Sequence, residues 1–128
     1  MTAGPKRWEW PDDLDAVVAA SEHHSVLLEN DRVRVLNTRV ESGDTVPVHT
    51  HRWPSVQYVL SIADFVRRDA DGHVLADSRS MELPKETPFT LWSEPIPPHT
   101  LENVGERIIH VLAIELKDSP DEVALDER

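Results

Sequence analysis

Cysteine is absent from the sequence, glycine is scarce, and there is no long apolar run. Without cysteine the chain can form no disulfide framework, no thiolate metal site and no cysteine nucleophile, which suits a reducing compartment. The four glycines make no glycine-rich phosphate loop, so nucleotide binding lacks support. No apolar stretch approaches the roughly 20 residues that cross a bilayer, and the N-terminus lacks the apolar stretch of a signal peptide. We therefore expect a soluble, cytoplasmic protein.

Basic residues are also few. Thirteen lysines and arginines oppose 24 acidic residues, which gives the 128-residue chain a formal net charge of -11 at pH 7. Residues 1–31 and 118–128 hold nine of these eleven excess negative charges, so the intervening residues are close to neutral. An acidic surface repels phosphate backbones and anionic lipids, and we therefore expect neither nucleic acid nor a membrane as a partner.

The residue pattern predicts one all-β domain between two flanking segments. Residues 1–31 are expected to form an N-terminal helical arm, because a Pro-Asp-Asp start precedes the good helix formers LDAVVAA. Further along, short runs of β-branched and aromatic residues alternate with turn signals such as Asp71-Gly72. Roughly eight or nine such strands predict an antiparallel sandwich or barrel over residues 32–117. Residues 118–128 are interpreted as an acidic C-terminal tail.

Histidine, in contrast, occurs seven times. His49 and His51 are separated by one residue in a predicted strand, so their side chains project from the same face. Two imidazoles on one strand face are the beginning of a metal site. His99, which follows a run of prolines at the start of a later strand, is the third candidate. The remaining histidines are interpreted as structural or solvated: His23, His24, His73 and His110.

The three candidate histidines lie in two segments that resemble the motifs of the cupin superfamily. GDTVPVHTH contains a glycine, five residues and His-x-His, as in the first half of motif one. PIPPHTLEN contains the H-x3-N pattern of motif two. The resemblance covers residues 32–117 and implies a cupin-type jelly-roll β-barrel with a short N-terminal helix. In particular, the chain resembles small single-domain bacterial cupins whose function is not assigned.

The sequence departs from the family pattern at one metal ligand. Ser55 stands where motif one usually has a glutamate, and the closing glycine of motif one and the glycines of motif two are missing. The resemblance therefore implies a metal held by His49, His51 and His99. Gln57, which should share the face of Ser55, could serve as a further oxygen ligand, directly or through water. Three neutral imidazoles leave a divalent ion its full charge and open positions for a substrate or dioxygen.

This ligand set predicts a small-molecule-binding metal cupin. By its resemblance to three-histidine cupins, the chain is a candidate metal-dependent, dioxygenase-like oxidoreductase that uses a divalent ion of iron, zinc, manganese or nickel. Two alternatives stay open at this point. One is a non-catalytic ligand-binding cupin, with or without metal, and the other is a metal-free isomerase or epimerase with a histidine base.

A few further residues are candidates for the pocket. Trp53 directly follows the His-x-His pair and Trp92 precedes the second motif, so each can line a substrate pocket together with Ser55, or serve only in packing. Arg39 and Arg52 could neutralise a substrate carboxylate, or form ordinary surface ion pairs.

The sequence also bears on assembly. Small cupins commonly dimerise, so the resemblance implies a homodimer. Residues 107–117, RIIHVLAIELK, form the most apolar predicted strand. As an edge strand it would need to be covered, which also favours a homodimer.

Overall fold

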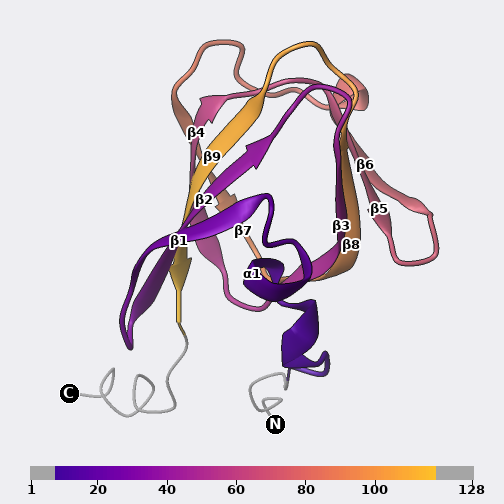
Figure 1. Cartoon of the computed structure of the whole chain (residues 1–128). Coiled ribbons are helices and arrows are strands. Elements are labelled where there is room, and N and C mark those ends of the chain that lie inside the picture. Colours follow the sequence, from indigo (N-terminus) through magenta and orange to yellow (C-terminus); the bar gives the residue numbers. More distant parts are fainter. Residues whose placement is uncertain (1–7, 118–128) are drawn as a thin grey trace, which may run out of the picture.

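The computed structural model describes residues 8–117, which form two antiparallel sheets that face each other (Figure 1). The larger sheet has the strand order β1 (His24–Glu29), β2 (Val33–Val40), β9 (Ile109–Leu116), β4 (Ser55–Ser61) and β7 (Phe89–Ser93). The smaller sheet has the order β3 (Thr45–His51), β8 (Ile96–Asn103), β5 (Phe65–Asp69) and β6 (Val74–Asp77). The predicted all-β architecture is confirmed, including the hairpin between β5 and β6, where Gly72 adopts a φ of 93°.

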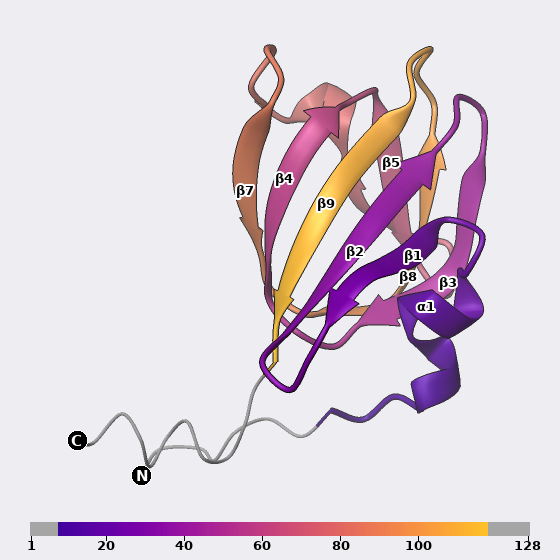
Figure 2. The same ribbon diagram turned by 60° about the vertical axis from the view of Figure 1, so that its left-hand side comes forward.

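Within residues 8–117, helical structure is confined to short turns. A 3-10 turn, η1 (Asp12–Leu14), is followed by α1 (Ala16–Ala19), whose first turn is capped by the Asp15 side chain. A second 3-10 turn, η2 (Ser78–Ser80), follows β6. Figure 2 shows α1 lying beside β3, with Ala16 fully buried. None of the helices among the described residues is long and apolar enough to span a membrane.

The flanking segments of the sequence differ in how much of them the structure describes. The segment predicted as a helical arm, residues 1–31, also contains β1, which pairs with β2 as part of the larger sheet. The predicted acidic tail, residues 118–128, lies outside the described residues.

The expectation that residues 107–117 form an edge strand is wrong. β9 lies between β2 and β4, and its Ala113 pairs with Leu36 on one side and Gln57 on the other. Both edges of β9 are therefore hydrogen-bonded to neighbouring strands and need no cover from a second chain. The edges of this sheet are β1 and β7 instead. The homodimer prediction therefore has a different physical basis, the exposed apolar residues of β1, which are Val26, Leu27 and Leu28.

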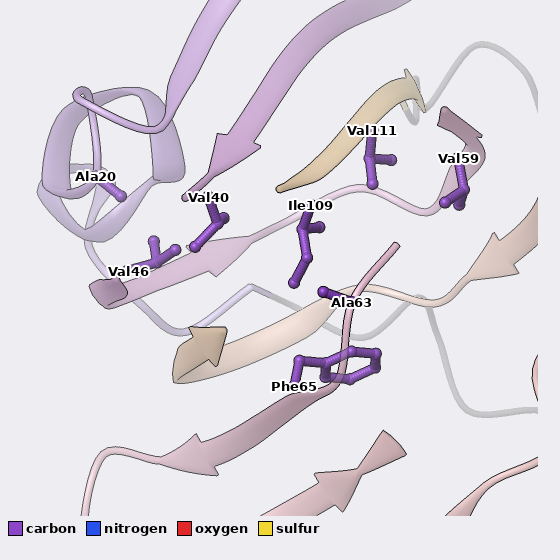
Figure 3. Close-up of a cluster of buried hydrophobic side chains, with 8 residues drawn as sticks. All are labelled: Ala20, Val40, Val46, Val59, Ala63, Phe65, Ile109 and Val111. Atoms are coloured by element: carbon purple, nitrogen blue, oxygen red, sulfur yellow. The ribbon is translucent and has the colours of Figure 1, made fainter. Parts of the chain in front are cut away.

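The hydrophobic core fills the interior between the two sheets (Figure 3). Burial alternates along β9, where Ile109, Val111 and Ala113 point inward. The side chains that cluster with Ile109 and Val111 come from both sheets and their connections: Ala20, Val40, Val46, Val59, Ala63 and Phe65. Ala113 packs instead with Ala16 and Leu36. Most of these side chains are small, so they leave room between the sheets for a cavity.

Asn103 connects β8 to the start of β9. Its side chain has no exposure, and its amide nitrogen donates to the carbonyl oxygens of Val40 at 2.9 Å and Arg107 at 2.8 Å. Its amide oxygen accepts from the backbone N–H of Gly105 at 2.9 Å. These hydrogen bonds to the backbone hold the end of β8 in place. The same strand carries His99.

Candidate functional site

Four imidazole rings lie together inside the barrel. His49 and His51 project from β3, and His49 pairs in register with His99 of β8. The fourth ring belongs to His24, the first residue of β1. The distances between ring centroids are 4.2 Å for His49–His99, 4.9 Å for His49–His51, 5.0 Å for His24–His49, 5.3 Å for His24–His51 and 5.5 Å for His51–His99.

The contribution of His24 corrects the sequence analysis, which gave it a structural or solvated role. Its ring is buried, and one ring nitrogen from each of His24, His49 and His51 lies within 4.8 Å of the others. The neighbouring His23 does not join them, because its Nε2 lies 2.8 Å from the Asp44 carboxylate. No motif marks His24, which reaches the cluster only because β1 pairs with β2 and places it opposite Thr38.

Backbone carbonyls fix the proton on three of the four rings. In each case Nδ1 contacts a carbonyl oxygen, which can only accept a hydrogen bond, so Nδ1 carries the hydrogen and Nε2 keeps its lone pair. The acceptors are Pro47 for His49 (2.7 Å), Pro97 for His99 (2.8 Å) and Ala20 for His24 (3.0 Å). A carbonyl behind each ring is the arrangement that orients histidine ligands of metal ions. His49 and His99 each follow a proline by two residues, Pro47 and Pro97. This shared Pro-x-His spacing is a sequence signal for the carbonyl contact, and it was not used in the prediction.

The same rings are held in their neutral form. Burial, followed by repulsion from His51, lowers the pKa of His24 to about 4. Burial, followed by the charges of His51 and Arg67, lowers the pKa of His99 to about 3. Burial and the neighbouring imidazoles also hold the pKa of His49 well below its usual range. A metal ion binds neutral imidazole, so these lowered pKa values leave the three rings able to bind a metal near neutral pH.

His51 is backed by a carboxylate instead of a carbonyl. Its Nδ1 lies 3.4 Å from Glu115 Oε2, and Glu115 is only 1% exposed. Arg34 donates to Glu115 Oε1 at 2.6 Å and to both carboxylate oxygens of Asp15, at 2.9 and 3.2 Å. A buried chain of charged groups therefore runs from the N-terminal turn to His51, and Arg34 compensates the Glu115 charge.

The sequence-predicted neighbours of the histidines occupy different places. Gln57 lines the cavity, and its amide nitrogen donates to the Ser55 hydroxyl at 2.6 Å, so the two residues share a face as expected. Trp92 also lines the cavity, whereas Ser55 and Trp53 are not among its lining residues. Trp53 lies instead against three cations, with ring-centroid distances of 4.9 Å to Arg34, 5.2 Å to Arg52 and 5.3 Å to Lys117.

The cavity itself has a volume of about 360 Å³. All four histidines line it, and most of the remaining lining side chains are apolar. Its volume lies within the range of small-molecule pockets, about 300–1,000 Å³. The other polar residues of its wall are Thr38, Gln57, Arg67 and Ser93. Sequence analysis missed Arg67, because no motif marks it. Arg39 and Arg52, the two arginines considered for a substrate carboxylate, are not among the lining residues.

Comparison with known proteins bears on the fold alone. Neither a family model nor a curated protein matches the sequence. Among solved structures, a cupin domain from Bordetella pertussis superposes with a TM-score of 0.59 at 18% identity, covering 74% of this chain and 92% of that one. An RmlC-like cupin with a double-stranded β-helix fold from Methanocaldococcus jannaschii superposes at 0.52 and 10% identity, covering 96% and 99%. A polyketide cyclase from Streptomyces resistomycificus superposes at 0.51 and 19% identity, covering 91% and 82%.

The strand order agrees with these likenesses. The two facing antiparallel sheets agree with the jelly-roll barrel that the resemblance implies. The two motif segments, residues 43–51 and 95–103, contain β3 and β8, which pair with each other. The chain therefore has the cupin fold, the double-stranded β-helix of the cupin superfamily.

Proposed function

We propose that this protein is a metal-binding cupin that binds a small molecule in its central cavity. One divalent ion is held by the imidazoles of the two motifs, His49, His51 and His99, and by His24. The observation that carries the proposal is the set of three Nδ1–carbonyl hydrogen bonds, which leaves a lone pair on the Nε2 of His24, His49 and His99, three buried rings of the one histidine cluster.

The donor set fits a borderline divalent ion. It consists of neutral nitrogen donors, which suit iron, nickel, zinc or manganese better than calcium or magnesium, ions that prefer oxygen ligands. Imidazoles do not neutralise the ion, so its positive charge remains in the cavity. When bound, such an ion supplies a Lewis-acidic centre with open positions for a bidentate substrate or dioxygen. Gln57, which lines the cavity wall, would contact a ligand bound beside the ion.

We further propose a dioxygenase-like oxidation of a small organic substrate as the reaction class. With four imidazoles as ligands, a six-coordinate ion would keep two positions for substrate or dioxygen in a largely apolar cavity. The apolar wall would hold the substrate and exclude competing water. The side chains of this chain would position the substrate and keep the imidazoles in the correct tautomer.

The isomerase alternative finds no specific support in the geometry. The single tyrosine, Tyr58, is partly exposed and does not line the cavity, so it cannot donate a proton there. With pKa values of about 4 and about 3, His24 and His99 are weak bases at neutral pH. A non-catalytic metal-binding pocket is the second candidate, since no other residue pair of the cavity forms an acid–base arrangement.

Metal content tests the site directly. Protein purified without added metal, and protein reconstituted separately with iron(II), zinc, manganese and nickel, is analysed for metal per chain. We expect about one ion per chain for the unmodified protein and less than about 0.1 for His49→Ala, because metal affinity depends on each ligand. His110→Ala is the matched control and should bind as the unmodified protein does, because His110 does not line the cavity and its Nε2 lies 2.6 Å from Asn37 Oδ1.

His24→Ala separates the four-histidine site from the three-histidine site that the motifs imply. We expect a loss of metal affinity of tenfold or more, and an unchanged affinity would remove His24 from the ligand set. Failure of the unmodified protein to take up any of the four metals would overturn the metal proposal. Oxygen consumption with thiols, diketones and phenols then tests the reaction, and no turnover with any of them favours a binding role.

A further inference from the structure

Arg67 brings an unpaired positive charge into the cavity. It lies on β5 two residues after Phe65, and both side chains line the cavity. Its Nε atom is buried and has no hydrogen-bond partner. Within residues 8–117, no carboxylate lies within ion-pair distance of its guanidinium.

This lack of a partner stands out in so acidic a chain. Acidic residues outnumber basic ones by 24 to 13, and the adjacent Arg68 has a partner, Glu102, at 2.9 Å. Arginine stays charged in proteins, and a buried charge without a counter-ion destabilises the fold. An arginine that keeps its charge at such a position is typical of a site that a bound anion completes.

The remainder of the cavity wall also favours an anion. Its lining includes no aspartate or glutamate, so nothing there competes for Arg67 or repels a negative ligand. Arg67 pairs with Leu101, two residues from His99 on β8, so Arg67 and His99 are diagonal neighbours on adjacent strands, and both side chains line the cavity. Diagonal neighbours in a sheet are about 7–8 Å apart, within reach of one small molecule.

We propose that Arg67 binds the carboxylate of a small organic acid, whose apolar body lies against the cavity wall and whose other end faces the histidine cluster. A guanidinium offers two parallel N–H groups that match a carboxylate. A phosphate dianion fits less well, because no lysine and no second arginine line the cavity. The inference rests on the proposed small-molecule cavity and names the substrate class for it.

The test compares acids with their uncharged isosteres. Benzoate, phenylacetate, 3-phenylpropionate and hexanoate are titrated calorimetrically into metal-reconstituted protein, each beside its primary amide. We expect at least one acid to bind tenfold or more tightly than its amide. Arg67→Gln should abolish this preference, and Arg67→Lys, which keeps the charge without the paired N–H groups, should retain part of it. Arg68→Gln is the matched control and should keep the full preference.

A measurement without ligand gives a second criterion. If Arg67 binds an anion and does not stabilise the fold, its unpaired charge destabilises the ligand-free protein. Arg67→Met should then raise the midpoint of thermal unfolding. A fall larger than that of Arg68→Met would assign Arg67 a structural role and overturn the proposal. So would a full acid preference in Arg67→Gln, or no preference for any acid in the unmodified protein.

Metal content, measured on the same samples, separates the two proposals. Metal binding without an acid preference overturns the role of Arg67 and leaves the metal site standing. If the protein takes up no metal but shows an acid preference that depends on Arg67, the carboxylate site is supported and the metal site is overturned.

Discussion

Arg34 and Glu115 face each other across β2 and β9 and form an ion pair that is almost entirely buried, with Arg34 Nε 2.6 Å from Glu115 Oε1. Their side chains are 4% and 1% exposed. The pair sits directly behind His51, so the electrostatics of the candidate metal site and the stability of the sheet depend on the same contact.

Removing one member of this pair should destabilise the protein strongly. We expect Arg34→Met to lower the free energy of unfolding by about 3–5 kcal/mol, because it leaves the Glu115 charge buried without a partner. Urea denaturation measures the change. Arg39→Met, on the exposed face of the same strand, should change stability by less than about 0.5 kcal/mol. Equal effects of the two substitutions would show that the pair contributes little.

The buried histidines should make the metal-free protein sensitive to acid. Burial lowers the folded-state pKa of His24 to about 4 and that of His99 to about 3, from the usual histidine value of about 6.5. Above pH 6.5 the rings are neutral in both states, so their contribution to stability is fully present. As the pH falls from 6.5 toward 4, these histidines become protonated in the unfolded chain but stay neutral in the folded chain. Each ring then lowers the free energy of unfolding by up to about 1.4 kcal/mol per pH unit.

Urea denaturation at several pH values measures this slope. His24→Gln should make it shallower, because glutamine does not titrate. A slope that is the same in His24→Gln as in the unmodified protein would contradict the assignment.

Asn103 should be among the most sensitive polar positions of the fold. Asn103→Ala removes three hydrogen bonds and leaves the carbonyls of Val40 and Arg107 without this partner, so we expect a loss of about 2–4 kcal/mol. Asn30→Ala is a suitable comparison, because the Asn30 side chain accepts backbone hydrogen bonds in an exposed turn. It should cost about 1 kcal/mol or less. Thermal unfolding of both variants ranks them, and an equal cost would contradict the prediction.

The homodimer prediction now concerns β1. Its exposed apolar side chains lie on an edge strand, so Leu27→Lys should convert a dimer of the full chain into a monomer. Light scattering coupled to size exclusion reports the mass. Leu75→Lys, at a similarly exposed position on the edge strand β6, should leave the dimer intact. A monomeric unmodified protein, or dissociation by Leu75→Lys alone, would contradict this placement.

The parts of the site that sequence could predict are those encoded locally. His49 and His51 lie two residues apart on one strand and so share a face, and the His-x3-Asn spacing marks His99. Strand geometry and motif order were sufficient to name these three residues as candidates. His24 and Arg67 carry no local pattern, and they reach the cavity only through the pairings of β1 with β2 and of β5 with β8. The position of β9 was mistaken for the same reason. An apolar run indicates burial, but it does not say which strands cover it.

The carbonyls of Ala20, Pro47 and Pro97 have a consequence for the proton balance of metal uptake. Because His24, His49 and His99 already hold one hydrogen, on Nδ1, and are neutral near pH 7, a metal ion displaces no proton from these three rings. The heat of metal binding contributed by these ligands should then be nearly independent of the ionisation enthalpy of the buffer. This distinguishes the site from cysteine-containing metal sites, which must lose protons before they bind.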